Sequence, residues 1–198
     1  MRVSILLAAA LLVSVPAVAA DREPPPGFTA LFNGRSLEGW SMVNTKDNFL
    51  VKDGILVLNK GAGWLASDKT FADFELRIRY RFVTPGTDSG IFIRAGLEGK
   101  NWPSKGYQVQ NMDNLTLGKV VRVKGNHNVD VLKRVKKATG EWQDLTIVAR
   151  GKSAKVSLNG EEVASTDDLT LLEGRVGLQA EGGILEFERI DIKPLTGK

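Results

Sequence analysis

Apolar and polar residues alternate along much of the chain, most clearly at residues 74–82. Apolar side chains occupy every second position of this segment, and arginine or glutamate stands between them. Successive side chains of a strand point to opposite faces, so the segment predicts a strand with one apolar and one charged face. Read as a helix, the same residues would scatter their apolar side chains around the cylinder, which argues against a helix.

Turn signals separate further segments of this kind. Asp53-Gly54 lies between residues 49–52 and 55–58, and Asn159-Gly160 lies between residues 155–158 and 161–163. Both dipeptides accept the positive φ angles of a two-residue hairpin turn. The pattern also predicts strands at residues 142–150, 175–180 and 184–193.

These elements predict an all-β fold. No segment of ten or more residues follows a convincing 3.6-residue period, and residues 167–173 are expected to form one short helical turn at most. Many short strands with glycine-rich turns and no crossover helices are typical of a β-sandwich of two antiparallel sheets. We therefore expect a jelly roll with one flat or concave sheet face exposed.

A candidate site arises from two short extended runs, residues 89–94 and 106–113. In the second run Gln108 and Gln110 share one face, whereas Tyr107 and Val109 share the other. If the two runs pair side by side, Arg94 and the two glutamines converge on one surface. We take that surface as the candidate site.

The N-terminus is typical of a secretory signal peptide covering residues 1–20. Arg2 precedes an apolar stretch at residues 5–15, and small residues lead to Ala19-Ala20 before the charged Asp21. The stretch is shorter than the roughly 20 residues needed to span a bilayer, although an uncleaved anchor is the alternative. We expect a periplasmic or secreted protein, with a proline-rich linker at residues 21–27, one domain at residues 28–195 and no membrane span after cleavage.

The composition excludes several kinds of catalytic site. The chain has no cysteine and a single histidine, His127, so a zinc site of the usual composition, a Ser-His-Asp triad and a Cys-His pair are all excluded. The glycines have no phosphate-cradling spacing, and there is no EF-hand loop. The sequence predicts no cofactor and leaves a divalent cation open. In its context His127 is expected to be an ordinary loop residue.

The formal net charge is +4, and residues 119–137 contain seven lysine or arginine residues but only one acidic residue, Asp130. The alternating valines of this segment allow a hairpin with a solvated basic face that discourages strand addition. Contact with an acidic glycan or a membrane surface is the alternative. Nucleic acid is a poor partner for an exported protein.

Aromatic residues near the candidate site suit a sugar ligand. The flat rings of Trp64, Trp102 and Tyr107 could stack on the apolar face of a pyranose while their polar tips form hydrogen bonds. Trp102 precedes the second run in a loop, where sugar binding and packing are both open. For Trp40 and Trp142 we expect core packing.

Short motifs occur in an order that resembles the 3-keto-disaccharide hydrolase domain family, from Phe28 to about Leu195. The motifs are Phe28-Thr29-Ala30-Leu31-Phe32-Asn33-Gly34, Trp40, Asp53-Gly54, Gly63-Trp64-Leu65, Phe74-Glu75-Leu76, Ser89-Gly90-Ile91, Arg94, Gly106-Tyr107, Gln110, Gly140-Glu141-Trp142, Asn159-Gly160, Gly177-Leu178-Gln179 and Glu186-Phe187. The resemblance implies a concanavalin-like jelly roll in an exported bacterial protein.

The resemblance also implies action on glycosides oxidised at C3 of the sugar. A ketone at C3 acidifies the C2 proton, so a base can remove it and the group on C1 can leave. On this basis Arg94 would stabilise the enolate, and Asp113 and Glu181 would be the acid and base. The substrate-binding residues would be Arg79, Asp88, Gln108, Gln110, Gln179, Trp102 and Tyr107, with Gln108 and Gln110 as orienting donors.

The chain departs from the family pattern at several of these positions. In the family, glutamate is usual at the positions of Arg79 and Gln108, and asparagine is usual at the position of Asp88. A histidine is often found near the position of Glu181. Neither an amide nor an arginine can act as a base in the working range. Two readings follow: an enzyme that uses Asp88, Asp113 and Glu181, or a non-catalytic glycan-binding module. A retaining glycosidase with two close carboxylates is less favoured, because the face is rich in amides.

Overall fold

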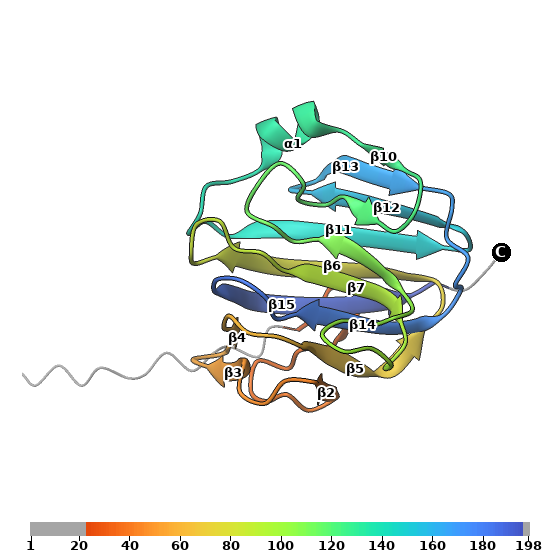
Figure 1. Ribbon diagram of the computed structural model, residues 1–198. Coiled ribbons are helices and arrows are strands. Elements are labelled where there is room, and N and C mark those ends of the chain that lie inside the picture. Colours follow the sequence, from red (N-terminus) through yellow and green to blue (C-terminus); the bar gives the residue numbers. More distant parts are fainter. Residues whose placement is uncertain (1–22, 196–198) are drawn as a thin grey trace, which may run out of the picture.

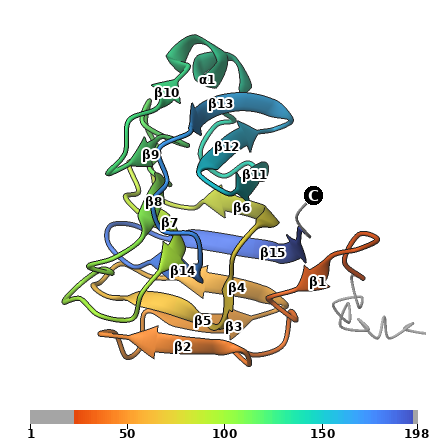
Figure 2. The same ribbon diagram turned by 90° about the vertical axis from the view of Figure 1, so that its right-hand side faces the viewer.

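The computed structural model describes residues 23–195, which form two antiparallel sheets packed face to face (Figure 1). The predicted signal peptide and residues 21–22 of the linker lie outside the described residues. Figure 2 shows the sandwich from the side, with β7, β8 and β9 in one layer and β6, β11 and β12 in the other. The expected jelly-roll sandwich is confirmed.

The larger sheet has nine strands within the described residues. Its order is β10 (Asn126–His127), β13 (Glu161–Thr166), β12 (Ser153–Leu158), β11 (Gln143–Arg150), β6 (Phe74–Phe82), β15 (Leu185–Pro194), β4 (Ile55–Leu58) and β3 (Phe49–Lys52), with β1 (Thr29–Ala30) also paired to β15. The six-stranded sheet has the order β2 (Trp40–Val43), β5 (Trp64–Phe71), β14 (Gly174–Gln179), β7 (Gly90–Ala95), β8 (Tyr107–Gln110) and β9 (Val120–Val121).

Strand β6 follows the predicted alternation. Its apolar residues are buried between the sheets, and its charged residues lie on the outer face of the nine-stranded sheet. From the six-stranded sheet, Ile91 and Ile93 of β7 and Val109 of β8 belong to the same core. Apolar burial on both inner faces is the main force that holds such a sandwich together.

Both predicted hairpin turns are present. Asp53 and Gly54 have φ angles of 52° and 79°, and Asn159 and Gly160 have φ angles of 50° and 91°. Two successive positive φ angles match the right-handed twist of the flanking strands. These turns fix the register of β3 with β4 and of β12 with β13.

The helical content differs from the prediction. Residues 167–173 form neither helix nor strand, and the one described helix is α1 (Val129–Val135), inside the basic segment that we expected to include a hairpin. The Asn128 side chain accepts a hydrogen bond from Val131 N and caps its first turn. Seven residues rich in valine give too weak a periodicity to detect. Within residues 23–195 no helix is both long and apolar enough to cross a bilayer.

Candidate functional site

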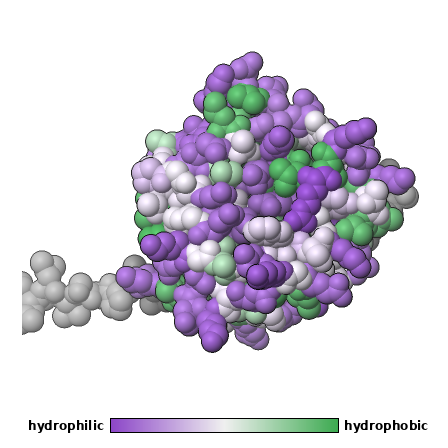
Figure 3. Space-filling view, in the orientation of Figure 1, coloured by the Kyte–Doolittle hydropathy of each residue, from purple (hydrophilic) through white to green (hydrophobic). Residues whose placement is uncertain are grey.

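The outer face of the six-stranded sheet carries the candidate site. Strand pairing aligns one row of residues across it, from Ala66 through Gly177, Phe92 and Gln108 to Val121. In the neighbouring row Gly90 pairs with Gln110. Figure 3 shows this side of the molecule as mostly hydrophilic, with small separate hydrophobic patches. The outer face therefore has an apolar half, which includes Ala66 and Phe92, and an amide half, which includes Gln108 and Gln110.

Three glutamines and one glutamate are linked by hydrogen bonds on this face; we call Gln108, Gln110, Gln179 and Glu181 the amide cluster. Gln108 Nε2 donates to Gln110 Oε1 at 2.7 Å and to Gln179 Oε1 at 2.9 Å. Gln179 Nε2 donates to Glu181 Oε2 at 2.6 Å. Gln110 Nε2 donates to Met112 Sδ at 3.1 Å. Every amide in the line therefore has a defined orientation.

Two glycines make room for large side chains on the face. A Cβ atom on Gly90 would lie 2.3 Å from Gln108 Nε2, and one on Gly177 would lie 2.4 Å from the Trp64 ring. Both glycines stand inside strands, where a missing side chain commonly marks a close approach. The Gln108 amide and the Trp64 indole can therefore lie flat against the sheet.

Asp88 is the second carboxyl of the site. Its backbone exchanges two 2.9 Å hydrogen bonds with Gly182, next to Glu181. Partial desolvation raises the pKa of the Glu181 carboxyl, although the residue is exposed, and the negative charge of Asp88 raises it further. Burial also raises the pKa of Asp88. The site thus contains two carboxyls that ionise less readily than usual, and a proton can transfer to or from them closer to neutral pH.

The apolar half of the face is covered. Trp64 and Phe92 pack edge to face with their ring centroids 5.5 Å apart, and Trp64 is only 1% exposed. The loop at residues 96–106 is tied to both edges of the sheet: Asn44 donates to Gly99 O after β2, and Arg122 donates to Pro103 O after β9. In Figure 1 this loop, which joins β7 to β8, runs across β14 and β5.

Two of the three aromatic residues predicted to stack on sugar, Trp64 and Trp102, therefore differ in access. Trp102 in the loop is 46% exposed, whereas Trp64 is buried beneath neighbouring residues. An exposed indole is free to stack on a sugar face, while a buried one stabilises the sheet beneath it. The polar half of the face, with the amide cluster and Asp88, is the accessible part.

Arg94 does not join this surface, and the expected convergence with the glutamines is wrong. Its side chain is fully buried and donates to the carbonyls of Ala72, Gly151 and Leu171 and to the carboxylate of Asp73. All of these partners lie at one end of the sandwich. Arg94 is placed to hold these segments together and cannot reach an enolate beside Glu181.

Asp113 also lies apart from the amide cluster. Its carboxylate accepts hydrogen bonds from Lys136 Nζ at 2.5 Å and Thr139 Oγ1 at 2.6 Å. Burial alone would raise its pKa, but these two bonds outweigh burial and hold the pKa below the ordinary value. A carboxylate held in its charged form by two donors is a poor proton donor.

Tyr107 points to the core side of β8, away from the predicted binding surface. Its hydroxyl accepts hydrogen bonds from the backbone N–H of Thr170 at 2.6 Å and of Leu171 at 2.8 Å. The ring is 5% exposed. Tyr107 therefore anchors residues 170–171 and has no access to a ligand on the outer face.

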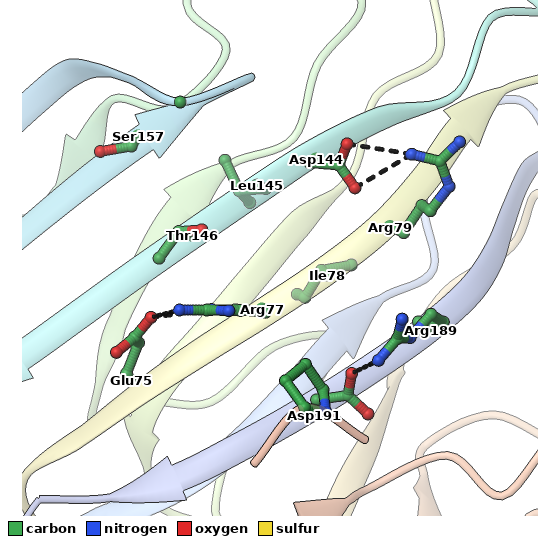
Figure 4. A pocket seen from close by; sticks show the side chains of 12 residues that line it. Glu75, Arg77, Ile78, Arg79, Asp144, Leu145, Thr146, Ser157, Arg189 and Asp191 are labelled. Atoms are coloured by element: carbon green, nitrogen blue, oxygen red, sulfur yellow. Dashed lines mark hydrogen bonds and ion pairs between the residues drawn. The ribbon is translucent and has the colours of Figure 1, made fainter. Parts of the chain in front are cut away.

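Arg79 lies on the other sheet, on the outer face of β6. It pairs with Asp144 at 2.9 Å and with Glu188 at 2.7 Å. Figure 4 shows it beside a groove of about 520 Å³ in which Arg77 pairs with Glu75 and Arg189 with Asp191. The predicted substrate-binding position of Arg79 is thus on the opposite side of the molecule. The charges of this groove are already matched in pairs, so the groove lacks an excess charge for a ligand.

The basic segment is largely committed to internal partners. Arg134 pairs with Glu161, Lys133 with Asp130 and Lys136 with Asp113, while Lys137 donates to Trp142 O. His127 lies in the short strand β10 and not in a loop as expected, and a ring nitrogen forms a hydrogen bond with Leu117 O at 3.1 Å. Among residues 23–195, no group of three acidic or histidine side chains lies close enough to hold a metal ion.

Sequence reasoning missed Gly90, Gly177 and Met112 as parts of the site. The available signal was a glycine inside each of two extended runs, because glycine weakens a strand unless another group needs the space. Of the predicted substrate-binding residues, the structure brings together Gln108, Gln110 and Gln179, and it places the predicted acid–base residue Glu181 with them and Asp88 beside them. Arg94, Asp113, Tyr107 and Arg79 lie elsewhere.

Solved structures share this fold at low sequence identity. Two proteins from Parabacteroides distasonis, described as candidate glycosyl hydrolases, match with TM-scores of 0.69 and 0.70 at 20% and 21% identity, covering 86% and 85% of this chain and 94% and 99% of theirs. The carbohydrate binding module CBM66 from Bacillus subtilis matches with a TM-score of 0.58 at 15% identity, covering 78% of this chain and 95% of its own.

The family comparison covers nearly the whole described chain. No curated protein sequence matches it significantly. The model of the 3-keto-alpha-glucoside-1,2-lyase-like domain matches residues 27–193. The chain therefore belongs to the 3-keto-alpha-glucoside-1,2-lyase-like domain family.

Proposed function

We propose that this protein is an exported enzyme that cleaves glycosides oxidised at C3, with Glu181 as the proton acceptor. The observation that carries the proposal is the geometry of Glu181: an accessible carboxylate, held through one oxygen by Gln179 and lying beside Asp88, in a chain of this family. The predicted signal peptide supports export. Glycosyl hydrolase-like and carbohydrate-binding relatives support a sugar as the ligand.

The reaction begins with removal of the C2 proton by the Glu181 carboxylate. The electron pair of the C2–H bond forms a C2=C3 double bond, and the C3 ketone becomes an enolate. The enolate then restores the C3 ketone, a C1=C2 double bond forms, and the C1–O bond breaks. The leaving oxygen takes a proton, and water finally adds across C1=C2, with its hydroxyl on C1 and its proton on C2.

The side chains at the site supply what each step needs. The raised pKa of Glu181 matches it to accept a proton and release it again near neutral pH. Asp88, whose pKa burial also raises, would protonate the leaving oxygen, and its raised pKa supports this role. Each amide nitrogen has two N–H groups; Gln110 and Gln179 use one each within the site, so each has one left for the enolate oxygen.

The test is release of the leaving group from 3-keto-glucosides and from their unoxidised parents. We expect cleavage of the keto forms only. Glu181→Gln should lower kcat by roughly 10²-fold or more, because the amide cannot accept the proton. The matched control is Glu162→Gln, whose carboxylate pairs with Lys155 on the other sheet and should leave kcat unchanged. Absence of cleavage of every keto form would refute the proposal.

A glycan-binding module without catalysis is the second candidate. The observation that favours it is the chemistry of the face, where amides outnumber carboxyls, together with the exposed indole of Trp102 in the loop at residues 96–106. Amides and aromatic rings bind sugar hydroxyls and faces without requiring proton transfer. Measurable glycan binding that Trp102→Ala weakens, together with no turnover of keto-glycosides, would establish this function in place of the first.

A further inference from the structure

We propose that Gln179 and Gln108 are positioning residues that fix the Glu181 carboxylate, with Gly90 providing the space that the Gln108 amide requires. The inference rests on the proposed role of Glu181 as proton acceptor. It concerns residues that do not themselves exchange a proton. Its experimental test includes a readout that does not depend on turnover.

The contact to Glu181 involves only one of its two oxygens. Gln179 Nε2 donates to Oε2 at 2.6 Å, which leaves Oε1 for the substrate proton. Glu181 is otherwise an exposed side chain that would sample several rotamers. A short hydrogen bond from a buried donor restricts it to one of them, and Gln179 is 4% exposed. Holding the reacting oxygen in place is a known source of rate enhancement.

Gln108 decides which way the Gln179 amide faces. An amide can present either its NH₂ or its oxygen, and the two orientations have nearly the same shape. Gln108 Nε2 donates to Gln179 Oε1 at 2.9 Å, so the NH₂ of Gln179 must face Glu181. Gln108 Nε2 also donates to Gln110 Oε1 at 2.7 Å, which prevents its own amide from turning round. Without Gln108, the Gln179 oxygen loses its donor, and the amide that contacts Glu181 is no longer fixed in place from its other end.

Gly90 gives the Gln108 amide its place. A Cβ atom at position 90 would lie 2.3 Å from Gln108 Nε2 and 2.7 Å from its Cγ and Cδ atoms. The φ angle of Gly90 is not in the left-handed region, so alanine is compatible with the backbone. Only the end of a flexible side chain is in the way. Gly90→Ala should therefore fold and displace the Gln108 amide from Gln179.

Among the described residues, Asp88 is the charged group whose charge shifts the pKa of Glu181. Substitutions at Gly90 and Gln108 leave Asp88 unchanged. A donor hydrogen bond favours the charged carboxylate, while burial and Asp88 oppose it. Loss of the Gln179 contact therefore raises the pKa of Glu181 further. This direction can be measured directly, without any substrate.

The experiment follows the carboxyl ¹³C resonance of Glu181 by NMR between about pH 3 and pH 8, and measures kcat and KM on a 3-keto-glucoside. The variants are Gly90→Ala, Gln108→Ala and the two combined. The matched control is Gly96→Ala, because a Cβ atom at position 96 meets only ordinary contact, 3.7 Å from Lys105 Cβ. It should behave as wild type in both measurements.

We expect each single variant to raise the midpoint of the Glu181 titration and to lower kcat roughly tenfold with KM nearly unchanged. The double variant should be no worse than Gln108→Ala, because the methyl group added at position 90 then has no amide to displace. An unchanged titration in Gly90→Ala, or additive effects in the double variant, would overturn the inference even if the enzyme turns over keto-glycosides. A shifted titration without turnover in any form would leave the positioning role intact and refute the proposed reaction.

Discussion

Asp113 and Lys136 form a short ion pair, 2.5 Å from Oδ1 to Nζ, between the segment after β8 and the end of α1. The Asp113 side chain is 5% exposed. Removing a buried carboxylate of this kind destabilises the fold, because it leaves the lysine without a partner. The residue predicted as an acid or base thus has a clear structural role.

Asp113→Asn should reduce stability at pH 7 by about 1–3 kcal/mol. Because the folded state holds the pKa of Asp113 below its ordinary value, the charged form stabilises the fold above the unfolded-state pKa. That contribution is lost as the pH falls through the lower, folded-state pKa. Urea unfolding at a series of pH values below about 5 should therefore show a steeper loss for wild type than for the variant. Equal stability at neutral pH would contradict the assignment.

The opposite sign is expected at Asp88. Burial raises its pKa, so the folded state binds its proton more tightly than the unfolded state. The associated stability is present below the unfolded-state pKa and is lost as the pH rises through the folded-state pKa. Asp88→Asn should therefore be slightly more stable than wild type at pH 7, by less than about 1 kcal/mol, with the gain vanishing below about pH 4. Thermal unfolding of wild type and variant at pH 7 and below about pH 4 measures the gain in stability and its disappearance.

Tyr107→Phe should lower stability by about 1–3 kcal/mol without affecting ligand binding. The variant leaves the N–H groups of Thr170 and Leu171 without their acceptor. Denaturant unfolding gives the stability, and glycan titration gives the affinity. A large drop in affinity at unchanged stability would return Tyr107 to the binding surface.

Arg94→Ala should destabilise the fold by about 3 kcal/mol or more, because it removes a fully buried side chain, leaves three carbonyls without its N–H groups and takes one of two donors from Asp73 Oδ1. The matched control is Arg77→Ala, which removes a half-exposed arginine from its pair with Glu75 and should cost less than about 1 kcal/mol. Comparable losses in the two variants would show that burial of Arg94 contributes little.

Local patterns were sufficient to predict much of the fold. The alternation of apolar and charged residues predicted β6, and the Asp53-Gly54 and Asn159-Gly160 turns predicted two hairpins. The two-residue spacing of Gln108 and Gln110 placed both side chains on one face of a strand. Each of these depends on neighbours along the chain. The partners of Asp113 and Tyr107 are distant in the sequence and lie in segments between strands. Which of these segments meet depends on the assembled sandwich, and no residue spacing in the sequence predicts it.

Arg94 illustrates how alternation can fail. If side chains alternated regularly along β7, Arg94 would lie on the outer face together with Gly90 and Phe92. The backbone has a φ angle of 49° at Arg94, and the pairing of β7 with β14 shifts register between Arg175 and Gly177. Such a bulge redirects the side chain, and here it turns the guanidinium into the end of the sandwich. A bulge adds no recognisable residue pattern, so the prediction was wrong at this position.

The partners of Arg94 also have a kinetic consequence. They are distant in the chain, with Leu171 77 residues away and Gly151 57 residues away. Their convergence requires both sheets to be in place, so we expect these bonds to form late on the folding pathway. Interactions that are absent from the transition state act on the rate of unfolding. We therefore expect the guanidinium of Arg94 to affect how long the folded molecule persists much more than how quickly it forms.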